Sequence, residues 1–373
     1  MSVISVLKND AYAPDELYAS VSAHFETLGI VELISPDMCV AVKPNLLAAR
    51  RPEAVATTHP ELVAAVVKWL QQNGVSDITV ADSAAGPYTP AALKGVYSAC
   101  GYTRLEGSVR LNYDCGFGEV VCAPGFRTRA FNIIDPIRNA DFIINVCKLK
   151  THAMTGISAG IKNLFGVIPG LQKPEMHYRN PDPDDFAGML IDLAETVSPE
   201  VTLIDAIDCM EGNGPGGGTP KHVGLTLASR DVFSLDRYAA MLMGIDPDSV
   251  PMLRIAKERG LVDTSAEIYG FDALPCTDPF VPPDTKSLDF TGYLPRFMRR
   301  GAAVVMDKLI RPIPRVDAAK CIGCGKCAES CPQHIISMGT GKASISRKGC
   351  ISCFCCQEMC PARAIIVKRK IKL

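Results

Sequence analysis

The residues with the most specific chemistry are cysteines near the end of the chain. The pattern C-x2-C-x2-C-x3-C-P occurs twice, and its second copy begins 29 residues after the first. The first copy contains Cys321, Cys324, Cys327 and Cys331, and the second contains Cys350, Cys353, Cys356 and Cys360. Ile322 and Ile351, and likewise Glu329 and Glu358, occupy matching places in the two copies. The segment is therefore an internal duplication.

Short spacings of this kind allow one loop to present three thiolates to an iron-sulfur cubane, whose fourth thiolate must come from elsewhere. The segment from Val316 to Leu373 resembles the bacterial two-cluster 4Fe-4S ferredoxins, which implies a small α+β domain. In that arrangement the last cysteine of each run crosses to the other cluster. The resemblance implies one cluster on Cys321, Cys324, Cys327 and Cys360, and another on Cys350, Cys353, Cys356 and Cys331.

A pair of four-cysteine zinc sites is the alternative, because such sites share the C-x2-C element. Zinc motifs have no reason to repeat a third cysteine, a fourth three residues later and a proline, so we favour the clusters. Cys355 lies outside the repeat, and we expect a spare thiol packed near a cluster. A ligand swap between Cys355 and Cys356 stays open.

Composition excludes several classes of protein. The chain has 373 residues, of which 47% are hydrophobic and 21% charged, and no apolar stretch reaches the roughly 18 residues of a membrane span. The first residues resemble no secretory signal, so we expect a cytoplasmic protein without membrane insertion. A net charge of -1 argues against a nucleic-acid partner. In a reducing compartment, closely spaced cysteines are better read as metal ligands than as disulfides.

The charge is unevenly distributed along the chain. Between Val316 and Leu373 there are ten Lys and Arg residues against three Asp and Glu residues, a formal charge of +7. Two oxidised clusters, at about -2 each with their thiolates, would reduce this to about +3. A mildly basic redox domain could dock an acidic electron carrier or its own acidic neighbour.

The larger N-terminal region alternates between strand and helix patterns. Strands are predicted over residues 39–42, 77–80, 141–146, 201–204 and 223–227, and helices from His59 to Leu70 with Thr58 as N-cap, over 184–197 and over 232–243. This alternation indicates a layered α/β domain with a mostly parallel sheet. Open sheets of this kind bind ligands at the carboxyl ends of their strands. Residues 43–45, 82–83, 148–152 and 205–208 are expected to converge there.

Residues 211–218 form a glycine-rich loop after the fourth of these strands. Gly212, Gly214 and Gly217 match G-x-G-x-x-G, but a dinucleotide-binding loop must open a helix and a strand pattern follows here. A mobile lid or a substrate loop fits better. No flavin or nicotinamide fingerprint occurs in the chain, so any further cofactor remains unidentified.

Several separate motifs occur in one order along this region. They are Lys43–Leu46, Thr57–Glu61, Lys148–His152, Lys162–Gly166 and Met210–Pro215. In this combination the chain resembles the domain of unknown function 362 family, a prokaryotic domain often joined to a ferredoxin domain. The resemblance implies an architecture and the place of a site, and no particular reaction.

The candidate site is cationic. Its lysines and histidines are Lys43, Lys148, Lys150, Lys162, Lys173, His152 and His177. Such a group suits a carboxylate or a phosphate and stabilises negative charge that develops during a reaction. Lys173 and Lys221 fit solvated surface lysines better, and His59 fits a structural role at a helix start. We expect acid–base or substrate contacts from His152 and His177.

Carboxylates beside the glycine loop supply a candidate general base, namely Asp205, Asp208 or Glu211, although each could equally pair with a lysine. Cys147, directly before Lys148, is a thiol worth testing for a lowered pKa. The predicted catalytic residues are Lys148, His152, Lys162, His177, Asp205 and Glu211, and the predicted cofactor-binding residues are Lys43, Asn45, Lys150, Asn163, Gly212 and Gly214.

The domains are expected at residues 1–272 and 316–373, joined by a proline-rich linker over 273–315. Within the linker, Tyr293 to Ile310 could form an amphipathic helix that packs on a neighbouring domain or, less readily, attaches to a membrane surface.

Three functions are compatible with these features. The first is a redox enzyme that passes electrons between two 4Fe-4S clusters and an anionic small molecule or cofactor in the large domain. The second is a non-enzymatic electron-transfer or assembly protein whose large domain binds a partner protein. The third is a hydrolase or transferase in which the clusters are structural. Possible partners are thus an electron carrier protein or a small-molecule substrate.

Overall fold

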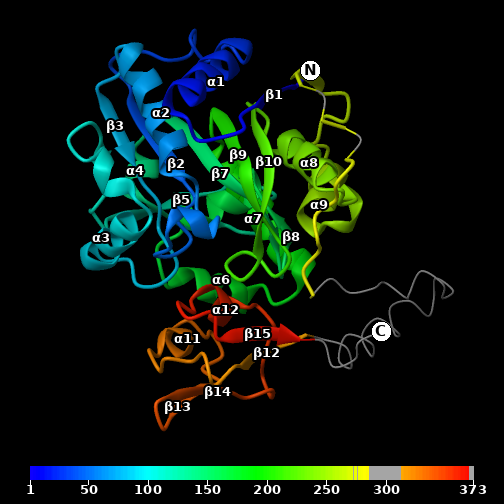
Figure 1. Cartoon of the computed structure of the whole chain (residues 1–373). Helices are drawn as coiled ribbons and strands as arrows, with labels where there is room; N and C mark the ends of the chain where they lie inside the picture. The colour runs from blue at the N-terminus through cyan, green and yellow to red at the C-terminus, as the bar shows by residue number, and fades with distance from the viewer. Residues whose placement is uncertain (272, 275, 285–311, 369–373) are drawn as a thin grey trace, which may run out of the picture.

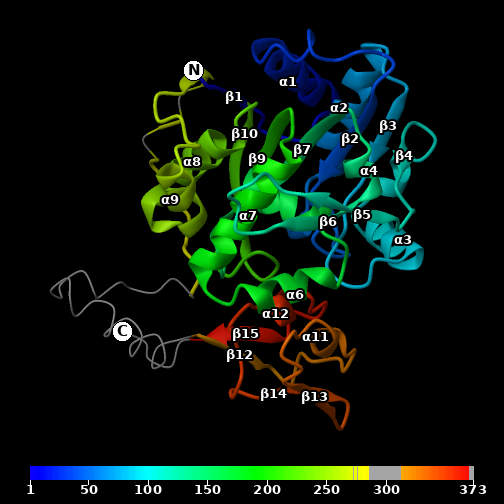
Figure 2. The same cartoon turned by 180° about the vertical axis from the view of Figure 1, so that it is seen from behind.

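The computed structural model describes residues 1–271, 273–274, 276–284 and 312–368. Figure 1 shows a large α/β domain with a small domain seated below it. The small domain lies against the end of the large domain that carries α6 (Gln172–Arg179), as the reverse view in Figure 2 also shows. The predicted helix over 293–310 lies outside the described residues.

A single twisted sheet runs through the large domain. Its nine strands within the described chain are β1 (Val3–Lys8), β2 (Cys39–Pro44), β3 (Asp77–Val80), β4 (Arg110–Leu111), β7 (Phe142–His152), β8 (Gly156–Ser158), β9 (Val201–Glu211), β10 (Thr219–Ser229) and β11 (Glu267–Gly270). They lie in the order β11-β1-β10-β9-β7-β2-β3-β4, and β8 pairs with β7. The neighbours β9, β7, β2, β3 and β4 are parallel, whereas β10 runs antiparallel to β1 and β9. The prediction of a layered, mostly parallel α/β domain is confirmed.

Helices cover both faces of this sheet. They are α1 (Pro14–Thr27), α2 (Pro60–Gln72), α3 (Pro90–Ala99), α4 (Asp135–Arg138), α5 (Gly160–Asn163), α6, α7 (Pro183–Val197), α8 (Val232–Leu242) and α9 (Pro251–Glu258). Because side chains alternate along a strand, β7 sends Ile144 and Val146 into the core under α1 to α3, and Leu149 into the core under α5 to α9. The hairpin β5 (Phe117–Val121) and β6 (Ala130–Ile134) lies outside the sheet.

The start of α2 corrects one prediction. The N-cap is His59, whose Nδ1 accepts a hydrogen bond from Glu61 N at 3.3 Å, so the choice of Thr58 was wrong by one residue. Pro60 at the first helical position suits a helix start because it has no N–H to leave unpaired. The Thr58 hydroxyl instead links β2 to β7, accepting from Asn45 N at 2.9 Å and donating to Val146 O at 2.8 Å.

The strands β2, β7, β9 and β10 are longer than the sequence pattern predicts. β7 continues to His152 and β9 to Glu211, so residues expected beyond the strand ends lie within the strands. The polar stretch remains in the sheet because its lysines find partners inside the protein: Lys148 pairs with Asp205, and Lys150 donates to Asn45 and to the Ala56 carbonyl. The sequence pattern predicts a loop at Lys148 and Lys150 because both side chains are polar.

The glycine-rich loop is the turn between β9 and the antiparallel β10. It is fastened to the end of β7, because Thr151 Oγ1 donates to Gly212 O at 2.8 Å and Ala153 N donates to Gly214 O at 3.1 Å. A Cβ on Gly214 would lie 1.9 Å from the Thr151 carbonyl oxygen. The anchored turn does not fit the expected mobile lid.

The small domain keeps the symmetry of its duplicated sequence. β12 (Ile313–Val316) pairs with β15 (Ile365–Lys368), and β13 (Ile336–Gly339) pairs with β14 (Lys342–Ile345), both antiparallel. The short helices α11 (Lys326–Glu329) and α12 (Cys355–Glu358) lie within the first and second cysteine runs. This is the small α+β domain that the sequence predicts.

Direct contacts join the two domains. Arg50 donates from Nη1 to Pro361 O at 2.8 Å and from Nη2 to Cys360 O at 2.6 Å. Phe354 is buried in an apolar cluster with Ala153 of the large domain. Before the undescribed segment, Phe280 of the expected linker packs into the large domain and its N–H donates to Met243 O at 2.9 Å. No helix in the described part of the chain has the length and apolar character to cross a membrane.

Candidate functional site

A cavity of about 590 Å³ lies where the two domains meet. We call it the interdomain cavity. Its large-domain lining comes from Asn45, Leu47, Asp82, Ser83, Ala85, Lys162, Asn163, Phe165, Gly166, Gly170, Lys173, Pro174 and His177, and its small-domain lining from Ser330, Cys355, Glu358 and Met359. Of the predicted site residues, Asn45, Lys162, Asn163 and His177 therefore share one cavity.

Of the two lysine amines in this wall, that of Lys162 makes fewer polar contacts with the described residues. It lies on α5, its Nζ is 4.6 Å from the centre of the Phe165 ring, and among the described residues it has neither a hydrogen bond nor an ion pair. Burial lowers the pKa of Lys162 from its ordinary value. An amine of this kind is available to an incoming anion.

His177 contributes a neutral ring. It lies on α6, stacks on Phe186 at 4.2 Å between ring centres, and its Nδ1 is buried without a hydrogen-bond partner. Burial, reinforced by the charge of Lys162, lowers the pKa of His177 to about 3. At neutral pH the ring is uncharged, so it can form a hydrogen bond but adds no positive charge.

Lys173 differs from the solvated lysine that the sequence suggested. Its Nζ donates to Ser83 O at 2.6 Å, to Ser83 Oγ at 3.1 Å and to Ile168 O at 2.6 Å. These three bonds hold the amine in the cavity wall without a carboxylate partner. Burial lowers the pKa of Lys173 to about 7, so its charge is sensitive to pH near neutrality.

Glu358 closes the cavity from the small domain. The Nδ1 of His152 accepts hydrogen bonds from Met154 N at 3.1 Å and Thr155 N at 3.3 Å, which places the ring proton on Nε2. That Nε2 lies 3.3 Å from Glu358 Oε1, a close polar contact. Burial lowers the pKa of His152. His152 therefore positions the carboxylate that faces the cavity.

Cys355 lies beside Glu358 in the same wall and is buried. In sequence it lies between Cys353 and Cys356, two members of the second cysteine run. The spare thiol is thus the part of that loop that reaches the cavity.

Two amides bring β2 and α5 together at the cavity. Asn45 Nδ2 donates to Asn163 Oδ1 at 2.9 Å, and Asn163 Nδ2 donates to Asn145 Oδ1 at 2.8 Å. Lys150 Nζ donates to Asn45 Oδ1 at 2.8 Å, and burial lowers the pKa of Lys150 to about 7. Lys150 thus reaches the cavity only through Asn45.

Two of the lysines expected at the site, Lys43 and Lys148, form buried ion pairs instead. Lys43 Nζ lies 2.9 Å from Asp82 Oδ1, and Lys148 Nζ lies 2.8 Å from Asp205 Oδ2. Asp205 also accepts from the Tyr12 hydroxyl at 2.9 Å and from His59 N at 2.9 Å. Their positive charges are therefore compensated within the large domain. Neither Lys148 nor Asp205 lines the cavity.

Glu211, Gly212 and Gly214 lie at the β9–β10 turn and also do not line the cavity. Glu211 Oε2 accepts from Val281 N at 2.9 Å and lies 3.8 Å from Lys221 Nζ. Asp208 pairs with His222 at 2.8 Å. For Cys147, burial holds the pKa well above its ordinary value, the opposite of the lowered pKa considered from sequence.

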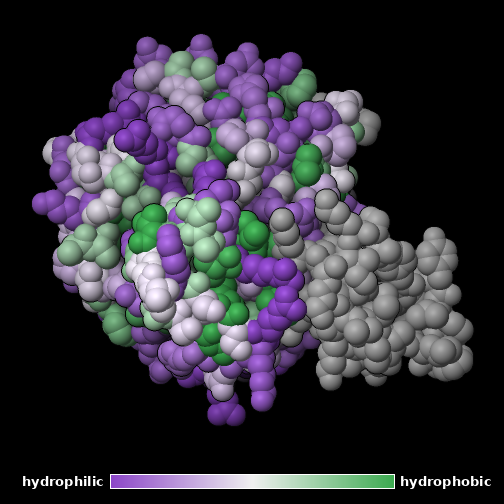
Figure 3. Space-filling model, turned by 60° about the horizontal axis from the view of Figure 1, so that its bottom comes forward, coloured by the Kyte–Doolittle hydropathy of each residue, from purple (hydrophilic) through white to green (hydrophobic). Residues whose placement is uncertain are grey.

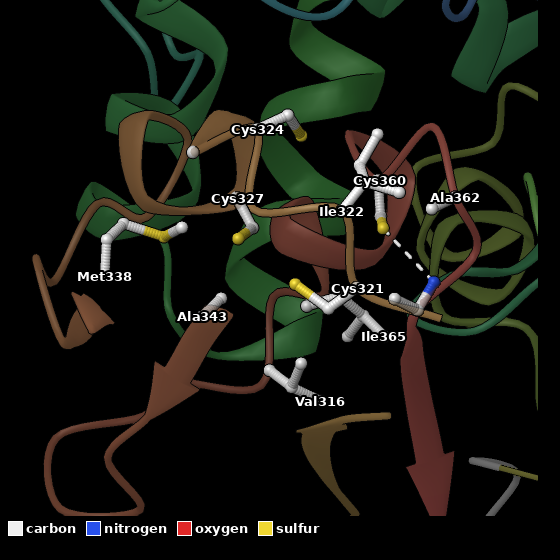
Figure 4. Close-up of a pocket in the computed structure, with 12 residues that line it drawn as sticks. Val316, Cys321, Ile322, Cys324, Cys327, Met338, Ala343, Cys360, Ala362 and Ile365 are labelled. Atoms are coloured by element: carbon white, nitrogen blue, oxygen red, sulfur yellow. Dashed lines mark hydrogen bonds between the residues drawn. The ribbon is translucent and has the colours of Figure 1, made fainter. Parts of the chain in front are cut away.

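The cysteines gather around two further cavities, each of about 320 Å³. Figure 4 shows the first, with Cys321, Cys324, Cys327 and Cys360 around it and the backbone N–H of Ala364 donating to Cys360 Sγ at 3.2 Å. The second is lined by Cys331, Cys350, Cys353 and Cys356.

These two groups correspond to the crossed sets implied by the resemblance, and the rest of both linings is largely apolar. In the described chain, no three His, Cys, Asp or Glu side chains meet closely enough for a single metal ion. A cubane differs, because its four ligands surround a whole cluster. Four thiol donors around an apolar space therefore fit a cubane.

Sequence reasoning missed the small-domain half of the interdomain cavity. Glu358 was noted as a repeated position and Cys355 as a spare thiol, but neither was assigned to the site. Asp82 and Ser83 were expected at the strand ends without a role. No local signal marks Met359 or Phe165, whose contributions depend on how the domains meet.

Comparisons with known proteins identify both domains. Residues 40–241 match a domain of unknown function (DUF362), and residues 313–361 match a 4Fe-4S dicluster domain. A thylakoid-associated protein of Synechocystis sp. (strain ATCC 27184 / PCC 6803 / Kazusa) is 33% identical over 267 residues, 71% of this chain and 82% of that protein.

A solved structure, the lactate racemase apoprotein from Thermoanaerobacterium thermosaccharolyticum, is 13% identical with a TM-score of 0.42. It covers 66% of this chain, which in turn spans 58% of that protein, and a likeness of this degree says nothing about activity. The match to the 4Fe-4S dicluster domain supports an iron-sulfur electron-transfer role. The chain belongs to the DUF362 family and carries a C-terminal 4Fe-4S dicluster domain.

Proposed function

We propose that the protein is a redox enzyme that exchanges electrons between two 4Fe-4S clusters and a small anionic molecule in the interdomain cavity. One cluster would bind to Cys321, Cys324, Cys327 and Cys360, and the other to Cys350, Cys353, Cys356 and Cys331. When bound, the clusters supply or accept single electrons.

The observation that carries this proposal is the shared wall of the cavity. Lys162 of the large domain and Cys355 of the small domain line the same space. Cys355 lies between Cys353 and Cys356 in sequence, within the second cysteine run. A molecule bound at Lys162 would therefore sit next to the ligand loop of the second cluster.

The lining indicates the class of substrate. Lys162 and Lys173 offer positive charge, whereas Glu358 offers a carboxylate acceptor. Phe165 and Met359 add apolar surface. A small carboxylate or phosphate that also carries a hydrogen-bond donor matches this combination. We propose that Lys162 binds the anionic group and that Glu358, held by His152, orients the donor.

Single-turnover oxidation of the clusters tests the proposal. The full chain is prepared anaerobically, and about eight irons per chain are expected. The reduced protein is then mixed with small carboxylates and phosphate esters while cluster absorbance is followed. A substrate should oxidise the wild type and the surface control Lys94→Met at equal rates. Lys162→Met should keep its iron and its paramagnetic signal but lose the substrate-dependent oxidation.

Two results would contradict the proposal. The first is a protein that binds zinc instead of iron. The second is an unchanged oxidation rate in Lys162→Met for every compound that oxidises the wild type. A cavity of this size suits a small molecule better than a protein surface, which is why we place the non-enzymatic alternative second.

We also propose the cytoplasm as the compartment. All sixteen cysteines are free of disulfides in the structure, and thiols persist in a reducing compartment.

A further inference from the structure

The two halves of the small domain have equivalent positions but different surroundings. Each cysteine loop contains a residue with a left-handed backbone before its short helix: Gly325 with φ of 78° and Phe354 with φ of 59°. Glycine adopts this conformation freely, whereas a phenylalanine there is strained. An unfavourable residue type at one of two equivalent positions indicates a compensating contact.

The second half makes that contact with the large domain. Phe354 is buried against Ala153. Cys355, at the position of Lys326 in the first half, lines the interdomain cavity, and Glu358 is held beside His152. The second cysteine loop is therefore the side of the small domain that faces its own large domain.

The first half leaves the corresponding positions open. Ile322 is 67% exposed, Met338 is 41% exposed, and Cys324 and Lys326 are exposed. All except Lys326 line the cavity of the first cysteine group. Figure 3 shows this end of the molecule, where green apolar patches lie among purple hydrophilic ones. We call the surface formed by Ile322, Cys324, Lys326 and Met338 the outer docking face.

Charge around the outer docking face is predominantly positive. Lys320, Lys326 and Lys342 are exposed there. Of the three carboxylates in the small domain, Glu358 is taken up at the domain interface and Asp317 lies 3.9 Å from Lys320, whereas Glu329 is exposed. An apolar centre bordered by lysines is complementary to a partner with an apolar centre bordered by carboxylates.

We propose that the outer docking face binds a small acidic electron-carrier protein, which exchanges single electrons with the first cluster. The inference rests on the proposed function in requiring that the clusters are present. In the reducing direction, a flavin carrier in its hydroquinone form loses one electron and becomes a semiquinone, and the first cluster gains that electron. The second half then serves the interdomain cavity, so electrons enter and leave at opposite halves of the duplication.

Rapid-mixing kinetics without any substrate test this surface. The anaerobically prepared full chain is mixed with photoreduced flavodoxin, an acidic flavin carrier, and loss of cluster absorbance is followed at low and high ionic strength. The second-order rate constant should fall as salt is added. Lys326→Glu should lower it by about tenfold at low salt, because a repulsive charge replaces an attractive one. Ile322→Asp should act in the same direction.

Lys94→Glu, on exposed surface of α3, is the matched control with the same change in net charge and should react like the wild type. Dithionite, a small reductant, should reduce all four proteins at one rate. Equal flavodoxin rates for Lys326→Glu and Lys94→Glu, or a rate that is insensitive to salt, would overturn the proposal. If Lys326→Glu loses iron, Lys320→Glu provides the same test outside the cysteine run.

The assay contains no anionic substrate, so it can succeed even where the cavity proposal fails. Iron content, measured first, identifies the one failure that both proposals share, which is the absence of clusters.

Discussion

Replacing Lys148 or Lys162 by methionine distinguishes a lysine that stabilises the large domain from one that is available to a ligand. Lys148 is 1% exposed and lies 2.8 Å from Asp205, which is fully buried. Lys162 has no carboxylate within ion-pair distance in the described chain. Methionine has nearly the length of the lysine stem, so both changes remove charge while preserving most of the packing.

The expected magnitudes differ strongly. Lys148→Met leaves Asp205 as an uncompensated buried charge, which costs about 3 to 5 kcal/mol. A domain of roughly 280 residues has an unfolding entropy of about 0.6 kcal/mol per degree, so the midpoint temperature should fall by about 5 to 9 °C. Lys162→Met removes a buried amine without breaking an ion pair. Its stability should stay within about 1 kcal/mol of the wild type, or rise.

Differential scanning calorimetry of the anaerobic full chain measures both changes, with Lys94→Met as the control for an exposed lysine. Equal losses of stability for Lys162→Met and Lys148→Met would refute the distinction, because Lys162 would then be a structural residue. A stable Lys148→Met protein would show that the remaining donors to Asp205, from Tyr12, His59 and Ile207, are sufficient for it.

Three further outcomes are expected. Sulfate, which keeps its charge over this range, should bind more tightly at pH 6 than at pH 9 in calorimetric titration, because Lys173 has a pKa of about 7 and is protonated only at the lower pH. Glu358→Gln should increase amide hydrogen exchange at the domain interface, whereas Glu329→Gln, at the equivalent exposed position, should not. Gly214→Ala should lower the unfolding midpoint, because its Cβ would collide with the carbonyl of Thr151; an unchanged midpoint would mean that the turn can shift.

Much of the fold could be predicted because the relevant signals are local. The spacing of the cysteines marked the dicluster domain, and runs such as residues 201–204 marked buried strands. Strand ends were harder, because Lys148 and Lys150 read as loop residues until their partners are known. A buried lysine is stable in a strand only through a contact made far along the chain.

The candidate site was harder still for the same reason. Nothing near Lys148 in the sequence shows that Asp205 neutralises it, and nothing near Lys162 shows that its amine has no such partner. Glu358 and Cys355 became visible as site residues only when the docking of the small domain was known. The motifs identified which residues carry chemistry. Whether each of these residues stabilises the fold or faces a ligand depends on tertiary contacts.

Gly325 and Phe354 occupy equivalent positions but differ in residue type, so one cysteine loop cannot replace the other. A chimera with residues 321–331 copied into 350–360 would retain every ligand position and a symmetric small domain. It would lose the Phe354 side chain that packs with Ala153, and it would have a lysine in place of Cys355 at the cavity. Such a protein would still carry iron, but both of its cysteine loops would have the features of the outward-facing loop. Neither loop would be suited to contact the large domain.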